Sequence, residues 1–423
     1  MSAPLVEPKD RYAFTIGLRW LWLTIFTGFF VRFEPAPYDL LIIAITVVFA
    51  AVGLLRMPAV ASTPLLLLGT FALASIIACF SASDYSYSVL HMGVTFYLVL
   101  SLILLMCLIC EDCERVTKVI WSAYLASAVC AAALAALGYY QLVPGLEIVT
   151  KGVGRAYGTF KDPNVLGPFL VPPTIYFFSR FELGSGRRAL VPLACALITL
   201  IGILLTFSRA AAANLAVTFL LYVFLRLVTA ERGSSVTRLL RCAVLAIVAG
   251  SAIVSWLVLN TDAGHTFENK TQLLRYYDNH RFATQEKGLE TILSWPFGVG
   301  SGMAKDALEM NLRTHSLYIQ TFLELGWLGG LAFITLLGAM LVRSWAAVRR
   351  GVRDPSFFVA LAAVIGLLMN SIVIDSTHWR HFWLLLGLVW GQLLVASYRQ
   401  EVQARPTNAG LRAPLSRQES VPS

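Results

Sequence analysis

His315 is the residue of this sequence best suited to acid–base chemistry, because it begins an apolar run with few other ionisable groups. The surrounding stretch, 313–330, reads RTHSLYIQTFLELGWLGG. We expect Thr314 to be a helix N-cap and His315 to lie in the first turn. The helix dipole disfavours imidazolium there, so His315 should be neutral and able to act as a general base near neutral pH. A purely structural histidine is the alternative.

Glu324 lies nine residues after His315, which corresponds to about 13.5 Å along a helix axis. A carboxyl group at such a depth in a membrane helix is costly and normally faces the bundle interior with a partner. Gly326, Gly329 and Gly330 then permit close approach of another helix. We therefore interpret Glu324 as a structural group, not as a second catalyst.

Three cations, Lys151, Arg155 and Lys161, lie in the segment KGVGRAYGTFKDPN, residues 151–164. Arg155 and Lys161 precede Asp162 and Pro163, a pair that is typical of a helix start. Helix N-termini bind anions, so this segment is a candidate phosphate site. Solvated loop charges are the alternative.

Arg209 lies in a second candidate segment, LLTFSRAAAANL, residues 204–215. One helix over the apolar run 188–228 would be about 60 Å long, twice the hydrocarbon thickness. We therefore predict a turn near Phe207, with Ser208 as the next N-cap. Arg209 would then lie at the membrane surface, where it either meets an anion or extends to water.

The stretch IDSTHWRHFW, residues 374–383, adds further polar groups, which we expect on the outer side of the membrane together with His315. Together with His315 they suggest zinc, but neither His-x-x-x-His nor paired carboxylates occur, so we predict no metal site and no cofactor. We expect Asp375 to orient a cation or a histidine.

The elements that must position these groups are membrane helices. The chain is 57% hydrophobic and 13% charged, with a mean hydropathy of +0.71, which is typical of an integral membrane protein. Since a span needs about 20 apolar residues and open backbone is excluded from lipid, we predict an all-α polytopic protein with about twelve transmembrane helices. The apolar runs are 13–31, 39–55, 63–80, 87–110, 116–141, 164–180, 188–206, 208–228, 238–259, 315–342, 356–374 and 379–398.

The distribution of Lys and Arg predicts the orientation. With a cytoplasmic N-terminus, connections on that side carry about twenty of the 33 basic residues, so both termini should be cytoplasmic. This pattern accounts for most of the net charge of +9, and nucleic-acid binding is not needed to explain it. We predict one transmembrane domain over 1–399, including a large outer loop over 260–314, and a disordered cytoplasmic tail over 400–423.

The outer loop is the expected place for function, since connections longer than about 15 residues are uncommon unless they are functional. Its arginines Arg275, Arg281 and Arg313 could bind phosphate oxygens and neutralise a diphosphate leaving group without a metal. The glycine run GVGSG, residues 298–302, lacks the context of a P-loop. We interpret it as a flexible hinge near the membrane.

Three motifs together resemble a known family. They are His-Ser-x-Tyr-x-Gln-x-x-x-Glu-x-Gly at 315–326, Arg-x-x-Gly-Thr-Phe-x-x-Pro-Asn at 155–164 and Ser-Arg at 208–209. Their order and spacing are similar to those of the O-antigen ligase and polymerase superfamily of bacterial inner membranes, and the resemblance covers nearly the whole chain.

The resemblance, closest to O-antigen ligase, implies a metal-independent, inverting glycosyltransferase of the inner membrane with a periplasmic active site. Its donor would be a glycan linked to undecaprenyl pyrophosphate, and its acceptor a sugar hydroxyl of lipid A-core. His315 matches the family's catalytic histidine, Arg209 its Ser-Arg arginine, and Arg155 the arginine of the Gly-Thr-Phe segment. Arg275 and Arg281 align less well. An O-antigen polymerase, a protein O-oligosaccharyltransferase and, from a different class, a secondary transporter remain alternatives.

Overall fold

Helices make up nearly all of the regular structure in the computed structural model, which describes residues 11–145, 150–151, 154–230, 233–260, 276–308 and 314–404. The strands found there are β1 (Thr150–Lys151) and β2 (Arg155–Ala156), which pair antiparallel with Thr150 opposite Ala156. The prediction of an all-helical protein is therefore confirmed for the described part of the chain.

Each of the twelve apolar runs falls on a helix. These helices are α1 (Arg11–Phe26), α2 (Pro37–Ala51), α3 (Ser62–Cys79), α4 (Tyr85–Glu111), α5 (Cys113–Tyr139), α6 (Pro163–Leu183), α7 (Leu190–Leu205), α8 (Arg209–Thr229), α9 (Ser234–Asn260), α13 (Leu317–Arg349), α14 (Pro355–Asn370) and α15 (Arg380–Ala404). The outer loop contributes α11 (Tyr276–Ser294) and α12 (Ala304–Ala307). Helix α15 extends into the predicted tail, of which residues 405–423 lie outside the described residues.

Eight helices in the described residues are long and apolar enough to cross a membrane. They are α3, α4, α5, α7, α8, α9, α13 and α15, while α2 and α14 are apolar but shorter. The chain is thus a multi-pass membrane protein, and the count of twelve crossings stays a prediction.

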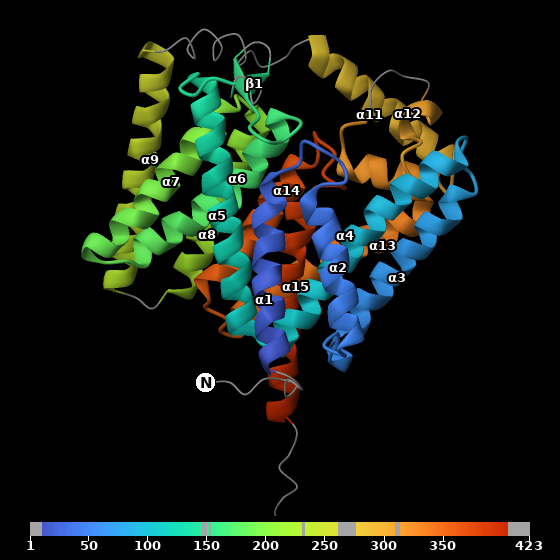
Figure 1. Cartoon of the computed structure of the whole chain (residues 1–423), viewed down its shortest axis with the longest axis horizontal. Helices are drawn as coiled ribbons and strands as arrows, with labels where there is room; N and C mark the ends of the chain where they lie inside the picture. The colour runs from blue at the N-terminus through green and yellow to red at the C-terminus, as the bar shows by residue number, and fades with distance from the viewer. Residues whose placement is uncertain are drawn as a thin grey trace, which may run out of the picture.

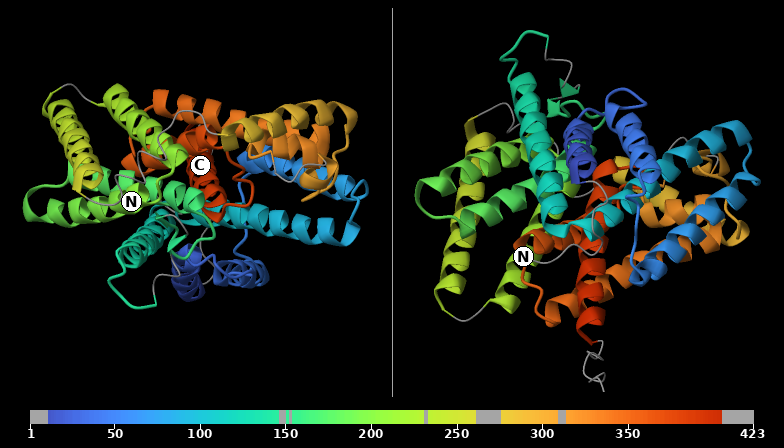
Figure 2. Two further views of the ribbon diagram at one scale, coloured as in Figure 1. Left: turned by 90° about the horizontal axis from the view of Figure 1, so that it is seen from above. Right: turned by 60° about the horizontal axis from the view of Figure 1, so that its bottom comes forward.

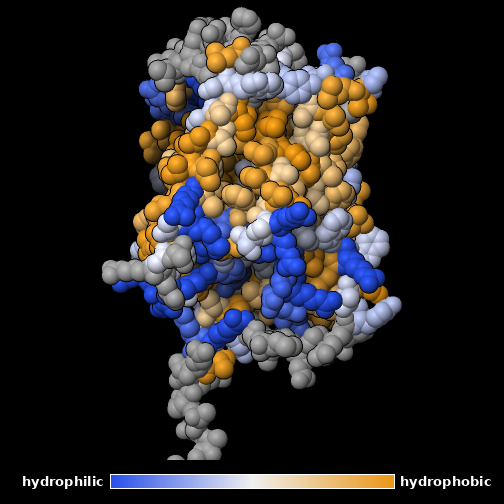
Figure 3. Space-filling model, turned by 90° about the vertical axis from the view of Figure 1, so that its left-hand side faces the viewer, coloured by the Kyte–Doolittle hydropathy of each residue, from blue (hydrophilic) through white to orange (hydrophobic). Residues whose placement is uncertain are grey.

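Helix α15 forms the centre of the bundle. It packs on α4, while α13 packs on α3 and α14 packs on α8. Helices α3, α11, α12 and α13 lie on one side of α15, and α6 to α9 lie on the other (Figures 1 and 2). In the apolar span of α15, 83% of the residues are buried, whereas in that of α9 only 11% are buried. The surface of the side formed by α6 to α9 shows an apolar band with a hydrophilic zone below it (Figure 3).

The two ends of the bundle differ. Helix α1 begins and α15 ends at one end, whereas β1, α11 and α12 lie at the other (Figure 1). The start of the first described helix and the end of the last one therefore lie at the same end of the bundle, and the assignment of that end to the cytoplasm stays a prediction.

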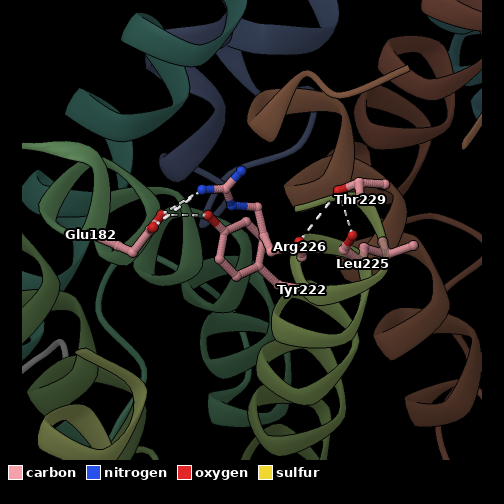
Figure 4. A network of polar contacts seen from close by, with 5 residues as sticks. All are labelled: Glu182, Tyr222, Leu225, Arg226 and Thr229. Carbon is pink, nitrogen blue, oxygen red and sulfur yellow. Dashed lines mark hydrogen bonds and ion pairs between the residues drawn. The ribbon is translucent and has the colours of Figure 1, made fainter. Parts of the chain in front are cut away.

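A buried ion pair joins α6 and α8 (Figure 4). Arg226 donates from one terminal nitrogen to both oxygens of Glu182, at 3.2 Å each, and the Tyr222 hydroxyl lies 3.5 Å from the same carboxylate. The Glu182 side chain is fully buried and that of Arg226 is 15% exposed. Pairing is what permits two charges in such a place.

We expect Glu182→Leu to destabilise the protein by about 3–5 kcal/mol, because Arg226 would remain buried without its anionic partner. The measurement is the thermal unfolding midpoint in detergent. Glu114→Gln is the matched control, since Glu114 pairs with Lys118 at 2.6 Å but is 76% exposed, and it should leave the midpoint unchanged. The double variant Glu182→Leu/Arg226→Leu should recover part of the lost stability. Equal unfolding midpoints for Glu182→Leu and Glu114→Gln would contradict a structural role of the buried ion pair.

Candidate functional site

His315 lies just before α13 in an unusual backbone conformation. The N-cap of α13 is Ser316, and the φ of His315 is +49°. The prediction that Thr314 caps the helix and that His315 lies in its first turn is therefore wrong. Positive φ is uncommon for a residue other than glycine, and it persists only where the surroundings impose it.

Hydrogen bonds on both sides of His315 impose this conformation. Leu317 N donates to Ser371 O at 2.9 Å, and Gln320 N donates to Ser316 O at 2.9 Å. On the other side, the Thr314 hydroxyl donates to Gln320 Oε1 at 2.7 Å. Thr314 and Ser316 are buried, whereas His315 is half-buried. The imidazole is thus held on a fixed backbone and reaches the surface.

Glu324 belongs to the same polar chain. Gln320 Nε2 donates to Glu324 Oε1 at 2.5 Å, so a buried line of hydrogen bonds runs from the carboxylate through Gln320 to Thr314. Glu324 is 5% exposed, and this partner meets the requirement of a buried carboxyl group. This line of hydrogen bonds reaches Thr314, the residue that precedes His315 in the sequence.

Helix α13 is broken at Gly326, two residues after Glu324. Gly326 has φ +68° and ψ −171°, outside helical values. The carbonyls of Leu323 and Glu324 instead accept from the N–H groups of Val299 at 2.9 Å and Gly300 at 3.1 Å, and Trp327 N donates to Pro296 O at 2.9 Å. The loop before α12 thus satisfies backbone groups that the break exposes.

The glycine run is therefore a packed wedge, and its interpretation as a flexible hinge is wrong. Val299 and Ser301 are 4% and 1% exposed. A Cβ added to Gly298 would lie 2.4 Å from Glu324 O, and one added to Gly326 would lie 2.3 Å from Pro296 O. Only glycine permits the two backbones to approach this closely.

Arg155 fastens the α7–α8 turn. Its Nε donates to Thr206 O at 2.8 Å, and one terminal nitrogen donates to Asn164 Oδ1 at 2.9 Å. Phe207 has φ +47°, and Ser208 caps α8 by accepting from Ala211 N at 3.3 Å. The predicted turn and N-cap are confirmed.

Arg209 is the first residue of α8, and it is exposed. Helix α14 packs antiparallel on α8, because Arg353, just before α14, donates to Thr229 O at the end of α8, and a Cβ at Gly366, near the end of α14, would lie 2.4 Å from Asn214 Oδ1. One helical turn further, about 6 Å along the axis, α14 ends beside the beginning of α8. Ser371, whose carbonyl holds Leu317, follows at once. Arg209 and His315 therefore lie at the same end of α14.

Arg281 lies on the face of α11 that packs against the His315 segment. Gln285, one turn later, donates to Ile372 O at 3.2 Å, and a Cβ at Gly288 would lie 3.1 Å from the Thr314 methyl. Residues 281, 285 and 288 share one helix face. Arg281 is half-buried. Arg275 and Arg313 lie outside the described residues.

Two other candidate residues have local partners. Lys161 pairs with Glu34 at 2.6 Å in an exposed position. Asp375 accepts from the amide of Thr377 at 2.9 Å and from its hydroxyl at 2.5 Å, so these bonds cap a turn and do not orient a cation or a histidine. His378 instead lies 3.0 Å from the Thr95 hydroxyl.

No group of three or more His, Cys, Asp or Glu side chains suited to a metal ion occurs among the described residues. The site combines a half-buried histidine on a strained, clamped backbone with arginines from two other elements. Such a set can take a proton from a hydroxyl and stabilise a departing anion.

Residues 194–334 match the O-antigen ligase family. The chain thus carries a segment similar to the O-antigen ligase family. The segment covers about a third of the chain (141 of 423 residues) and includes Arg209, Arg281 and His315. Arg155 and Asp375 lie outside it. No curated protein matches the chain.

The O-antigen ligase segment ends within α13, beyond the break at Gly326. It therefore contains the wedge, the polar chain below Thr314 and α11. Sequence reasoning missed Gln320 and Ser371 as the groups that hold His315. The only signal for the wedge was the glycine spacing.

Proposed function

We propose that the protein is an O-antigen ligase of the bacterial inner membrane. In this proposal it transfers a glycan from undecaprenyl pyrophosphate to a sugar hydroxyl of lipid A-core at the periplasmic face. The observation that carries the proposal is His315, which lies within the O-antigen ligase segment on a backbone that its neighbours hold at positive φ.

The proposed reaction is a single displacement with inversion. His315 takes the proton of the acceptor hydroxyl, whose oxygen attacks the anomeric carbon while the bond from that carbon to the diphosphate breaks. Arg209 and Arg281 stabilise the departing diphosphate, and Arg275 is a further candidate from the same loop. No metal ion is required in this scheme, and excess chelator should leave transfer unchanged.

Arg155 has a supporting part in this scheme. Its hydrogen bond to Thr206 O holds the turn that precedes Arg209. Arg155 therefore acts on the diphosphate by positioning Arg209. Lys161, with its charge paired to Glu34, is a weaker candidate for direct phosphate contact, and the contacts of Asp375 with Thr377 give it a structural part.

The deciding experiment is a purified assay with a lipid-linked glycan as donor and lipid A-core as acceptor. Formation of glycan-bearing lipid A-core supports the proposal. In cells, loss of a ligase leaves unglycosylated core and accumulated lipid-linked polymer. Single repeat units on the core would instead indicate a polymerase, glycan missing from proteins would indicate a protein transferase, and altered solute uptake would indicate a transporter.

We expect Thr314→Val to lower kcat by about 10-fold with little change in KM, because losing the bond to Gln320 loosens the backbone of His315 and misplacement slows chemistry. Thr314→Ser keeps the donor hydroxyl and should keep most of the rate. Steady-state kinetics of the purified variants are the measurement. A valine variant with the full rate, or a serine variant slower than the valine variant, would show that the hydrogen bond to Gln320 does not control the rate.

A further inference from the structure

A cavity of about 410 Å³ lies at the end of the bundle away from His315. It is lined where α5 and α14 begin and where α6 and α15 end. The site around His315 lies at the opposite end of these helices, where α14 ends and before α15 begins. The two sites are therefore separated by the length of these helices, and the cavity plays no part in the proposed transfer.

The lining carries three cations, Lys118, Arg180 and Arg399, against two carboxylates, Glu114 and Asp354. Both carboxylates already accept hydrogen bonds from other groups. Asp354 caps α14 by accepting from the amide and hydroxyl of Ser356, at 3.0 and 2.7 Å, and Glu114 pairs with Lys118 at 2.6 Å.

Arg180 is the least compensated of these cations. It lies in the last turn of α6 and is exposed. Among the described residues, no hydrogen bond or ion pair of its guanidinium is found. The balance of charge in the cavity therefore favours an anion.

An aromatic pair forms the apolar wall of the same cavity. The rings of Trp121 and Tyr176 stack with centroids 4.5 Å apart. Trp121 is 1% exposed, so the wall is part of the core. Aromatic rings next to cations at the end of a membrane span are typical of the level of lipid headgroups.

We propose that this cavity binds the phosphate headgroup of an anionic membrane lipid. Guanidinium groups bind phosphate oxygens in pairs of hydrogen bonds, which assigns Arg180 and Arg399 to the phosphate. Tyr176, which stacks on the buried Trp121, is assigned to the less polar part of the lipid. The candidate spans of α5 and α15 begin and end here, at Cys113 and Val402. The cavity therefore lies at the depth of lipid headgroups. A soluble anion would make no contact that requires the aromatic wall.

The test compares full-length protein with two double variants. Arg180→Gln/Arg399→Gln removes both cavity arginines. Arg187→Gln/Arg188→Gln removes two exposed arginines of the α6–α7 connection, which do not line the cavity, and is the control matched in charge. Native mass spectrometry in detergent then measures binding of phosphatidylglycerol and of phosphatidylcholine.

We expect phosphatidylglycerol to bind the unaltered protein and the control with equal affinity and the cavity variant about 30-fold more weakly, since each cation contributes about 5-fold near an anionic headgroup. Phosphatidylcholine should bind weakly to all three. Equal weakening in the control would show a general surface effect and overturn the proposal. So would equal binding of the two lipids, or displacement of the lipid by inorganic phosphate, which would assign the cavity to a free anion.

Discussion

His315→Ala should remove glycan transfer, with a rate loss of about 10²–10⁴-fold, which is the usual contribution of a general base. The backbone around residue 315 is held by Thr314, Ser316 and Ser371, so the variant should remain folded. The measurement is product formation in the purified assay. Full transfer by this variant would refute the assignment of His315 as the base.

The positive φ of residue 315 complicates an alanine substitution, because alanine is strained there. His315→Asn is the better matched variant, since asparagine tolerates this conformation and cannot serve as a base near neutral pH. It should be as inactive as His315→Ala and at least as stable. His378→Gln is a control for general loss of histidine, because His378 contacts Thr95, and it should keep its activity.

Gly326→Ala should be the most damaging single change in α13. Its φ of +68° and the 2.3 Å approach to Pro296 O leave no room for a Cβ. We expect about 1–3 kcal/mol of backbone strain and about 1–3 kcal/mol of overpacking. Thermal unfolding in detergent measures the loss, and a fall in transfer should accompany it because the chain from Glu324 to Thr314 begins beside this glycine.

Gly338→Ala is the matched control in the same helix. A Cβ at Gly338 would meet nothing within 4 Å, so alanine there should leave the protein unchanged or stabilise it by about 0.5–1 kcal/mol. If Gly326→Ala unfolded at the same temperature as Gly338→Ala, the break in α13 would not be a feature that the wedge enforces.

Local patterns were sufficient for most of the helices. Each apolar run falls on a helix, because burial of backbone groups in lipid leaves no other spanning form. The caps at Asp162 and Ser208 also follow from local chemistry, since each side chain accepts from an amide two or three residues later. The turn at Phe207 could be predicted from length alone, because one helix over residues 188–228 would be twice as long as the hydrocarbon layer is thick.

The candidate site was less predictable, because its geometry depends on contacts between distant segments. Ser371 fixes Leu317, and the wedge at 296–300 ends the first part of α13. Neither contact leaves a periodic signal in sequence. The cap at Thr314 was mispredicted because its hydroxyl turns to Gln320. Arg281 could be placed near His315 only once the packing of α11 was known.

The broken helix also constrains the order in which the protein can assemble during synthesis. The carbonyls of Leu323 and Glu324 need the amides of Val299 and Gly300, and unsatisfied carbonyls are costly in lipid. Residues 296–300 leave the ribosome before α13 does. The donors are therefore already available when the helix that needs them enters the membrane, and a nascent chain can complete the break as soon as its second half is inserted.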